Sequence, residues 1–301
     1  MGMITSGSFA KALWPGVNAW YGKAYNEYKV EWTDLFDQYK SSRAFEEDVG
    51  VSSFGLAKVK TEGAPIEYDS ERQAFTTRYQ HVAYGLGFII TREIMEDDQY
   101  DIVGQRKAQG LAFSMRQTKE VVAANIYNNA FSSGTGGDGK YLCDTSRPNL
   151  AGGTWQNKPT TDVDISEAAL EQAQIDIAGF TNDRGLLIAV RPKTLVIPRQ
   201  LIFEVHRILK SNGRVATDNN DPNALKDMGI IPRVVTNHFL TDTDAWFIRT
   251  DVPNGMKYFE RRGDQFDMDN DFDTENAKYK ATARYSFGWT DPRGIYGSQG
   301  A

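Results

Sequence analysis

The strongest hydrophobic pattern along the chain is helical and lies within residues 91–131. Apolar side chains recur there at the spacing of one helix face: Leu111, Met115, Val122 and Ile126. The segment begins with the acidic stretch TREIMEDD and ends at the glycine-rich FSSGTGGDGK, which would break a helix. We therefore expect one long helix, in which the stretch from Asp101 to Phe131 forms a rod at about 1.5 Å per residue.

Residues 50–90 have a different pattern, rich in β-branched and aromatic side chains. Gly63, Pro65 and Asp69 lie in the middle and favour a turn. The segment therefore predicts two long strands joined by a polar tip, with one face more apolar than the other around residues 76–81. A lone two-stranded ribbon of this length has too little core to be stable alone, so we expect it to lie on another surface.

Residues 164–250 predict a smaller mixed unit. Asp164 or Ser166 can cap a helix that carries Leu170, Ala173 and Ile177 on one face. Residues 185–190 and 194–198 are short apolar runs typical of buried strands. Residues 199–211 predict a second helix, with these side chains inward: Leu201, Val205, Ile208 and Leu209.

Residues 230–235 and 245–250 predict two further strands, and residues 255–290 predict two long ones. Helices and strands are thus mixed along the chain without strict alternation. The fold class that follows is α+β.

Residues 1–49 are rich in aromatic side chains and are interrupted by Pro15, Gly16 and Gly22. The aromatic residues are Trp14, Trp20, Tyr21, Tyr25, Tyr28, Trp32, Phe36, Tyr39 and Phe45. Two interpretations stay open at this point. The segment either packs on its own domain as an amphipathic helix, or forms an arm that places aromatic side chains on a neighbouring subunit.

Composition narrows the range of functions. The 301 residues carry 34 basic and 40 acidic side chains, a net charge of -6, and contain no dense basic run, which disfavours a direct grip on nucleic acid. Cys143 is the single cysteine, so an intrachain disulfide and a multi-cysteine zinc site are excluded. No apolar run approaches the roughly 20 residues of a membrane span, and the first residues do not resemble a signal peptide. We expect synthesis in a cytoplasm and no membrane partner.

Residues 134–140, GTGGDGK, have the G-x-x-x-x-G-K spacing of a phosphate-binding loop. However, position 141 is Tyr, where the magnesium-binding Ser or Thr belongs. The segment also follows a predicted helix, whereas a phosphate-binding loop follows a strand and opens a helix. We interpret it as a flexible connection and keep a nucleotide-binding enzyme as the alternative from another functional class.

An acidic run suggests calcium: Asp264, Asp267, Asp269, Asp271 and Asp273. Counted from Asp267, however, Phe272 takes the glycine position of an EF-hand loop and Lys278 the position of its bidentate Glu, which excludes that motif. We favour a solvated acidic turn between two strands, with an irregular cation site as the alternative.

The remaining reactive side chains are scattered. The histidines, His81, His206 and His238, are not at metal-ligand spacing from one another. The chain has no G-x-S-x-G nucleophile motif, and Cys143 lies in a turn-like segment where a surface or half-buried thiol is expected. We therefore assign no catalytic residue, no cofactor and no metal ligand.

Three segments, taken in order, resemble the major capsid proteins of tailed bacteriophages, most closely the Mu-like major head subunits. They are GLGFIITREIMEDDQYD (85–101), RPKTLVIPRQLIFEVHRIL (191–209) and MKYFERRGDQFDMDNDFDTENAKYKATARYSFGWTDPRGIYGS (256–298). The paired strands that end in FGW, followed by DPRG and YG, are the most specific part. The resemblance covers roughly residues 50–298.

This resemblance implies a division into four parts. Residues 1–49 would be an N-terminal arm and residues 50–90 an extended β-ribbon loop. Residues 91–163 and 246–290 would form a peripheral domain with a long spine helix, and residues 164–245 and 291–301 an axial domain.

The resemblance also implies the partners. Copies would form hexamers and pentamers that build an icosahedral shell around DNA, and the mildly acidic wall would repel the DNA. Some relatives carry a long charged helical stretch ahead of the arm as a built-in scaffold. Because none precedes the arm here, either a separate scaffold protein or earlier removal of such a segment is expected. Portal and decoration proteins are further expected partners. The final location would be the virion.

Two further possibilities accompany the resemblance. Some relatives cross-link subunits through a Lys–Asn isopeptide bond, and Lys58 and Lys60 lie on the ribbon where such a lysine could be, but no partner Asn can be assigned. An encapsulin-like bacterial compartment shell is an alternative with the same fold. Such a shell would co-purify with an enzyme and lack neighbouring phage genes.

Overall fold

The predicted long helix is present as α3 (Tyr100–Asn128), preceded by the short α2 (Arg92–Glu96). The computed structural model describes residues 18–27, 29–52, 54–63, 65–96, 100–150, 152–213, 221–271 and 275–301. Leu111 and Met115 are buried, while Val122 and Ile126 are partly buried against the same core. The periodicity of these apolar positions therefore gave the helix and its inward face.

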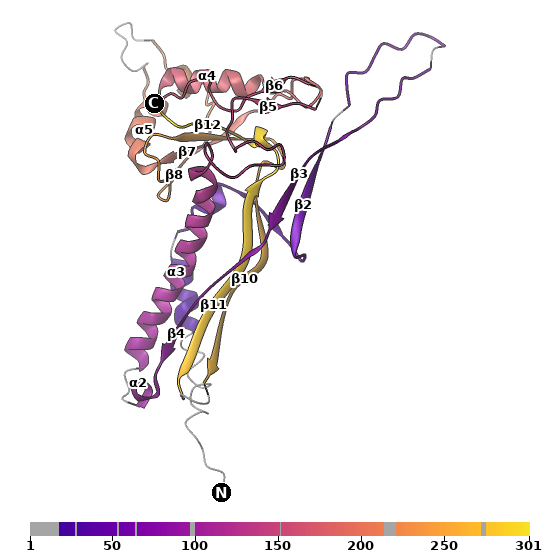
Figure 1. The fold of residues 1–301 in the computed structure, drawn as a ribbon. Helices are drawn as coiled ribbons and strands as arrows, with labels where there is room; N and C mark the ends of the chain where they lie inside the picture. The colour runs from indigo at the N-terminus through magenta and orange to yellow at the C-terminus, as the bar shows by residue number, and fades with distance from the viewer. Residues whose placement is uncertain are drawn as a thin grey trace.

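A long four-stranded sheet runs beside α3 (Figure 1), in the order β1 (Asp37–Lys40), β10 (Met256–Asn270), β11 (Ala277–Trp289) and β4 (Val82–Ile90). β1 is parallel to β10, and the other two pairs are antiparallel. Buried residues alternate along β11, including Tyr279, Ala281 and Ala283. The small alanines let the helix approach the sheet closely, and this interface forms the first hydrophobic core.

The aromatic side chains of residues 20–36 pack on this same core. A helix over residues 18–27 stacks Tyr21 on Phe266, with ring centroids 4.6 Å apart. The 3-10 turn η1 (Trp32–Asp34) is held by Glu120 of α3, whose carboxylate accepts the Glu31 and Trp32 backbone N–H groups at 2.9 Å each. This part of the predicted arm thus packs on its own chain. Trp14 and Tyr28 lie outside the described residues.

A second sheet has the order β12 (Ile295–Ser298), β9 (Trp246–Thr250), β7 (Pro192–Pro198) and β8 (Val234–Asn237). The helices of this unit are α4 (Glu167–Ala178), η2 (Arg199–Leu201) with α5 (Ile202–Lys210), and α6 (Ala224–Asp227). Of the two predicted caps, Ser166 is the one at the N-terminus of α4, where its hydroxyl accepts the Ala169 N–H at 3.1 Å. All four apolar side chains predicted inward on residues 199–211 are buried.

The second sheet lies between two hydrophobic cores. Trp246 and Ile248 of β9 face the core formed with α4 and α5, whereas Phe247 between them faces the first core. There its ring centroid lies 5.2 Å from that of Tyr127 and 5.5 Å from that of Phe131, near the end of α3. Because both faces are covered at the centre of this sheet, β7 and β9 contain continuous apolar runs, at residues 195–197 and 246–248.

Three sequence-based assignments need correction. The division implied by the resemblance placed β9 in the peripheral domain, but it is an inner strand of the second sheet, with the smaller mixed unit. Residues 185–190, all described, were expected to be a strand but contain only an isolated bridge, and Leu187 is 71% exposed. A turn closed by the Asn182 N–H on the Leu186 carbonyl, and Ala189 at φ 50°, break the extended backbone there.

The ribbon is the third correction. It pairs β2 (Phe45–Val51) with β3 (Gln73–Gln80), so it starts earlier than residue 50, and the described residues between 52 and 72 form no strand. β4, predicted as part of the ribbon, belongs to the long sheet. The described part of the chain contains no helix long and apolar enough to cross a membrane.

Candidate assembly surface at the ribbon

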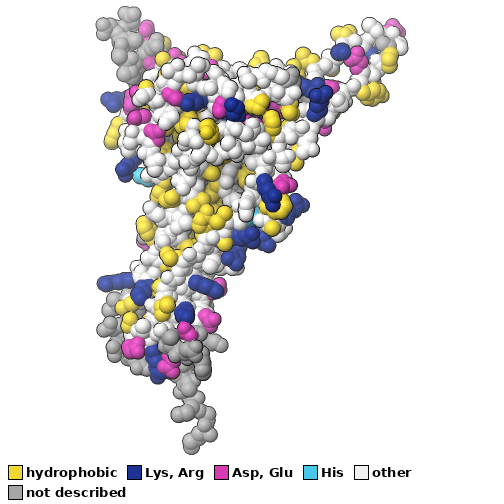
Figure 2. Space-filling view, viewed as in Figure 1, with side chains coloured by type: hydrophobic (Ala, Val, Ile, Leu, Met, Phe, Trp, Pro, Cys, Tyr) yellow, Lys and Arg dark blue, Asp and Glu magenta, His cyan; other side chains and the backbone are white. Residues whose placement is uncertain are grey.

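The segment between β2 and β3 projects away from the rest of the molecule (Figure 1). Its large apolar side chains are exposed: Phe54, Leu56, Val59, Ile66 and Tyr68. Val59 and Tyr68 are each 95% exposed, and Figure 2 shows apolar side chains along the projection. We call residues 54–68 the projecting loop. An uncovered apolar segment of this kind, beside a ribbon with free edges, marks a protein–protein contact.

One polar tie holds the projecting loop at its base. The Asp69 carboxylate accepts the Gly55 N–H at 2.9 Å and the Arg184 guanidinium at 3.2 Å, and Arg184 also donates to the Ser70 carbonyl at 2.8 Å. The backbone N–H groups of Gly55 and Ser70, followed by Arg184, lower the pKa of Asp69. The tie connects the loop to the unit that contains the second sheet.

Asp69→Ala is expected to loosen the projecting loop without changing global unfolding, because the carboxylate touches only the loop and Arg184. We expect limited proteolysis between residues 54 and 71 to become several-fold faster, while the unfolding midpoint stays constant. Glu67→Ala is the matched control, since among the described residues Glu67 pairs with exposed Lys58 at 2.5 Å, within the loop itself. Equal cleavage rates in the two variants would contradict the tie.

In the unaltered protein the tie should persist at pH values above the ordinary carboxyl range and weaken as the pH falls through the lowered pKa of Asp69.

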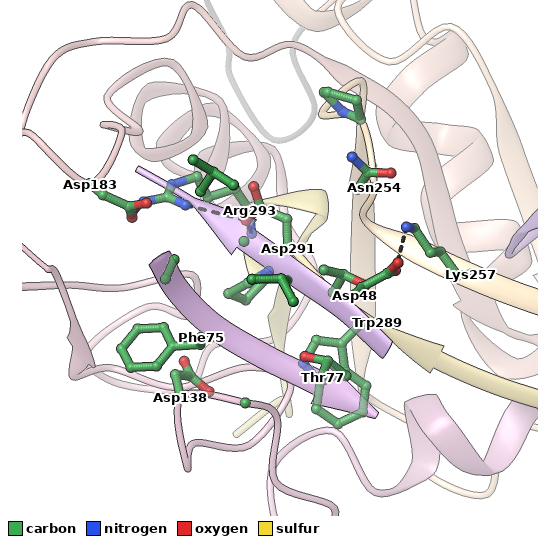
Figure 3. A pocket seen from close by; sticks show the side chains of 18 of the residues that line it. Asp48, Phe75, Thr77, Asp138, Asp183, Asn254, Lys257, Trp289, Asp291 and Arg293 are labelled. Atoms are coloured by element: carbon green, nitrogen blue, oxygen red, sulfur yellow. Dashed lines mark hydrogen bonds and ion pairs between the residues drawn. The ribbon is translucent and has the colours of Figure 1, made fainter. Parts of the chain in front are cut away.

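A crevice of about 440 Å³ lies where the ribbon meets both units (Figure 3). Four carboxylates line it, from Asp48, Asp138, Asp183 and Asp291. Each has a cationic partner: Asp48 pairs with Lys257 at 2.5 Å, Asp138 with Arg147 at 2.5 Å, and Asp183 and Asp291 with Arg293 at 2.7 and 3.4 Å.

Burial raises the pKa of Asp291, while Arg293 beside it acts in the opposite direction. Each of the four carboxylates contacts a cation of the same chain, with Arg293 shared by Asp183 and Asp291, so these polar groups connect the ribbon to the body. They do not present a free acid–base pair to a substrate.

The glycine-rich segment forms one wall of this crevice. Its backbone groups are used internally, since the Gly136 N–H binds the Lys140 carbonyl at 2.9 Å and the Gly139 N–H binds the Gly136 carbonyl at 3.0 Å. The Lys140 ammonium binds Ser146 at 3.0 Å. A phosphate-binding loop presents such groups to its ligand, so this geometry disfavours nucleotide binding. The expected flexible connection is a tight turn packed on the ribbon.

Gly137 makes the closest contact of that turn. A Cβ atom at this position would lie 2.6 Å from the Thr76 carbonyl oxygen of β3, which is backbone and cannot rotate away. We expect Gly137→Ala to destabilise the protein by about 1–3 kcal/mol in chemical unfolding. Gly110→Ala is the control, because a Cβ there on α3 meets nothing within 4 Å. It should stabilise by about 0.5–1 kcal/mol. Equal effects of the two variants would contradict this packing.

The acidic run does not form the expected solvated turn, because most of it lies along β10. Asp264 is largely buried, where it accepts hydrogen bonds from Tyr25 at 2.5 Å and Lys119 at 3.1 Å. Asp267 and Asp269 lie opposite Lys280 and Lys278 across the β10–β11 pair. Asp271, just after β10, pairs with Lys278 at 2.6 Å, and Asp273 lies outside the described residues. Across the described ranges no three His, Cys, Asp or Glu side chains group as metal ligands.

The other candidate residues are also separated in space. His206 is exposed on α5, His238 pairs with Glu31 at 2.6 Å, and His81 is buried at the base of the ribbon. Cys143 is buried, not at the surface as expected, and burial raises the pKa of its thiol to about 12. Lys58 of the ribbon pairs with Glu67. The hydrogen bonds of Asp69 with Arg184 and of His81 with Ser41 and Ser286 had no signal in the sequence, since these partners lie far away along the chain.

Comparison with known families decides what this arrangement is for. The sequence model of a family described as "Phage capsid protein" matches residues 73–298, from β3 through β12. The chain belongs to the phage capsid protein family. It is a structural subunit of a capsid shell, as the resemblance of its three segments implied. No curated protein matches the sequence.

Solved structures with the same fold include several shells. The capsid of a native GTA particle shares 12% identity at a TM-score of 0.55, covering 88% of each chain. A chain from Mycobacterium phage Che8 shares 13% at 0.52, covering 89% of this capsid protein and 90% of that chain. A virus-like particle from Pyrococcus furiosus shares 10% at 0.53, covering 93% and 96%. Likeness at these identities concerns the fold alone, so the compartment-shell alternative is not better supported than the phage capsid.

Proposed function

We propose that this capsid protein is the major head subunit of a tailed phage, whose copies join through hexamers and pentamers into an icosahedral shell around DNA. The observation that carries the assembly role is the projecting loop, whose apolar side chains are not covered by their own chain. A neighbouring copy would cover them by packing and strand addition.

Head-to-tail contacts between copies related by rotation close into rings, which suits a loop that extends to one side. Each contact can be modest, because several simultaneous contacts hold a subunit far more tightly than one. The Mu-like subtype, the domain division with β9 and the ribbon bounds corrected as above, and a scaffold-assisted route of assembly are parts of this proposal.

We assign no catalytic step to the protein. The pairing of every crevice carboxylate with a cation of the same chain and the internally bonded glycine turn support this assignment. Scaffold, portal and decoration proteins are the proposed partners, DNA is enclosed without sequence-specific binding, and synthesis is proposed to occur in the host cytoplasm before incorporation into the virion.

Negative-stain electron microscopy of the purified protein, across a range of concentration and salt, tests the proposal. We expect closed shells, tubes, or rings of five and six subunits. Particles that stay monomeric or dimeric even when the scaffold protein from the same phage is supplied would overturn it. Measurable ATP or GTP binding by the purified protein would instead favour the enzyme alternative.

A further inference from the structure

His81 lies at the joint between the ribbon and the long sheet. It is the single residue between β3, which ends at Gln80, and β4, which begins at Val82. Its partner Ser41 lies on the other connection between the long sheet and the ribbon, between the end of β1 and the start of β2. Since only 4% of His81 is exposed, its imidazole is enclosed where both strands of the ribbon leave the body.

The hydrogen bonds fix which ring nitrogen carries the proton. The Ser41 hydroxyl donates its one hydrogen to the Glu46 carboxylate at 2.7 Å, so it must accept from its other neighbours. It accepts the Arg43 N–H at 3.1 Å and therefore also the Nε2–H of His81 at 3.1 Å. In a neutral imidazole Nδ1 is then an acceptor, and it takes the Ser286 hydroxyl proton at 3.0 Å. With a neutral imidazole, each hydrogen bond from Ser286 through His81 and Ser41 to Glu46 has one donor and one acceptor.

A second proton on the ring would disturb this arrangement. Nδ1–H would face Ser286, whose hydroxyl would have to turn its hydrogen elsewhere. The new charge would lie near the cations of Arg284 on β11 and Arg261 on β10, against the single carboxylate of Glu46 on β2. Burial, then Arg284, with a smaller contribution from Arg261, lowers the pKa of His81, and Glu46 opposes them. Arg284 is also bound to the His81 carbonyl at 3.3 Å.

We propose that His81 is a proton-controlled latch at the ribbon joint, which holds the ribbon on the long sheet when neutral and releases it when protonated. The joint closed around the neutral ring binds fewer protons than the open joint, in which His81 would titrate near the ordinary value of about 6.5. The latch is therefore fully closed above that pH. Below it, the opening constant rises by up to about tenfold per pH unit until the lowered pKa of the closed joint is reached.

Only one consequence of the latch rests on the proposed function: release of the ribbon would change how the projecting loop contacts a neighbouring subunit. The latch itself is a property of one chain. Backbone hydrogen exchange, followed by mass spectrometry and corrected for the intrinsic pH dependence of exchange, reports it in free subunits and in shells alike. If shells never form but the ribbon loses its protection from exchange at low pH, the proposed assembly function is wrong and the latch is still supported.

We expect peptides covering residues 41–51 and 73–81 to lose protection several-fold, and at most about thirtyfold, between pH 7.5 and pH 5, with peptides from α4 unchanged. His81→Gln keeps an N–H donor and an oxygen acceptor but cannot titrate, so its ribbon protection should not depend on pH. His206→Gln, at an exposed histidine, should behave like the unaltered protein. A pH response that persists in His81→Gln, or is absent from the unaltered protein, would overturn the latch.

The charged neighbours provide a second test that simple loss of packing would not reproduce. Glu46 raises the pKa of His81 and Arg284 lowers it. Glu46→Gln should therefore move the midpoint of the ribbon transition to lower pH, and Arg284→Gln should move it to higher pH. Shifts in the same direction, or no shift in either variant, would show that His81 is not the titrating group. If His81→Gln does not fold, these two variants still decide the question.

Discussion

Arg147→Ala is expected to lower the free energy of unfolding by about 3–5 kcal/mol, because it would leave a buried carboxylate without its partner. The Arg147 side chain is 0% exposed, and its guanidinium binds Asp138 at 2.5 Å, the Leu142 carbonyl at 2.7 Å and Asn157 at 3.0 Å. Its partners span the glycine turn, the segment after it and the loop that reaches the second sheet. Loss of this one side chain thus loosens three segments together.

Chemical denaturation of the unassembled protein measures the effect. Arg207→Ala, at an exposed position of α5, should change the free energy of unfolding by no more than about 0.5 kcal/mol. Arg147→Lys keeps the charge but lacks the planar fork, so an intermediate loss is expected. A loss below about 1 kcal/mol for Arg147→Ala would mean that water replaces the guanidinium and that the contacts of Arg147 with its three partners contribute little to stability.

Local periodicity carried most of the fold that could be predicted. The repeat of Leu111 and Met115 predicted α3, and the pattern of Val205, Ile208 and Leu209 predicted α5, because a helix shows its buried face at a fixed spacing. The segments that resembled the capsid family gave the architecture, and the family match agrees with them.

Partnership between distant segments was not predictable from local pattern. Trp246–Thr250 reads as a buried strand, but nothing in those residues says which sheet contains it. The β-branched residues near Val59 read as a strand, yet a strand forms only where another strand pairs with it, and this segment has none in its own chain within the described residues. The apolar run at 185–190 failed because of a turn and a positive φ angle at Ala189, a residue that rarely adopts one.

The assembly site likewise combines features that local sequence predicts with features that depend on distant segments. Its apolar side chains could be named from the sequence, but their exposure could not. Asp69 and Arg184 are 115 residues apart, and His81 and Ser286 are 205 apart, so only the folded chain brings them together. Tyr141 distinguishes the glycine turn from the phosphate-binding motif in the sequence, but the contact of the turn with Thr76 could not be foreseen.

Replacing three side chains of the projecting loop, Leu56, Val59 and Tyr68, with serine is expected to raise the concentration needed for assembly while leaving the subunit folded. None of the three is buried in its own chain, so the free energy of unfolding should change by less than about 1 kcal/mol. Burial of a large apolar side chain at a contact contributes roughly 1.5–3 kcal/mol. Ordering of the loop on binding offsets part of the sum over the three side chains. The variant is therefore expected to lose about 3 kcal/mol of binding free energy per contact between subunits. Such a loss raises the concentration needed for assembly about a hundredfold.

A matched triple variant separates the loop from exposed apolar area in general. Ile175, Leu187 and Met228 are 64%, 71% and 72% exposed and lie outside the loop, so their replacement with serine removes a comparable apolar surface elsewhere. Light scattering and electron microscopy across a concentration series would give the assembly threshold of each variant. We expect the loop variant to need at least tenfold more protein than the control. Equal thresholds would mean that the loop is not the contact that closes the shell, because the neighbouring copy would then cover some other surface of the subunit.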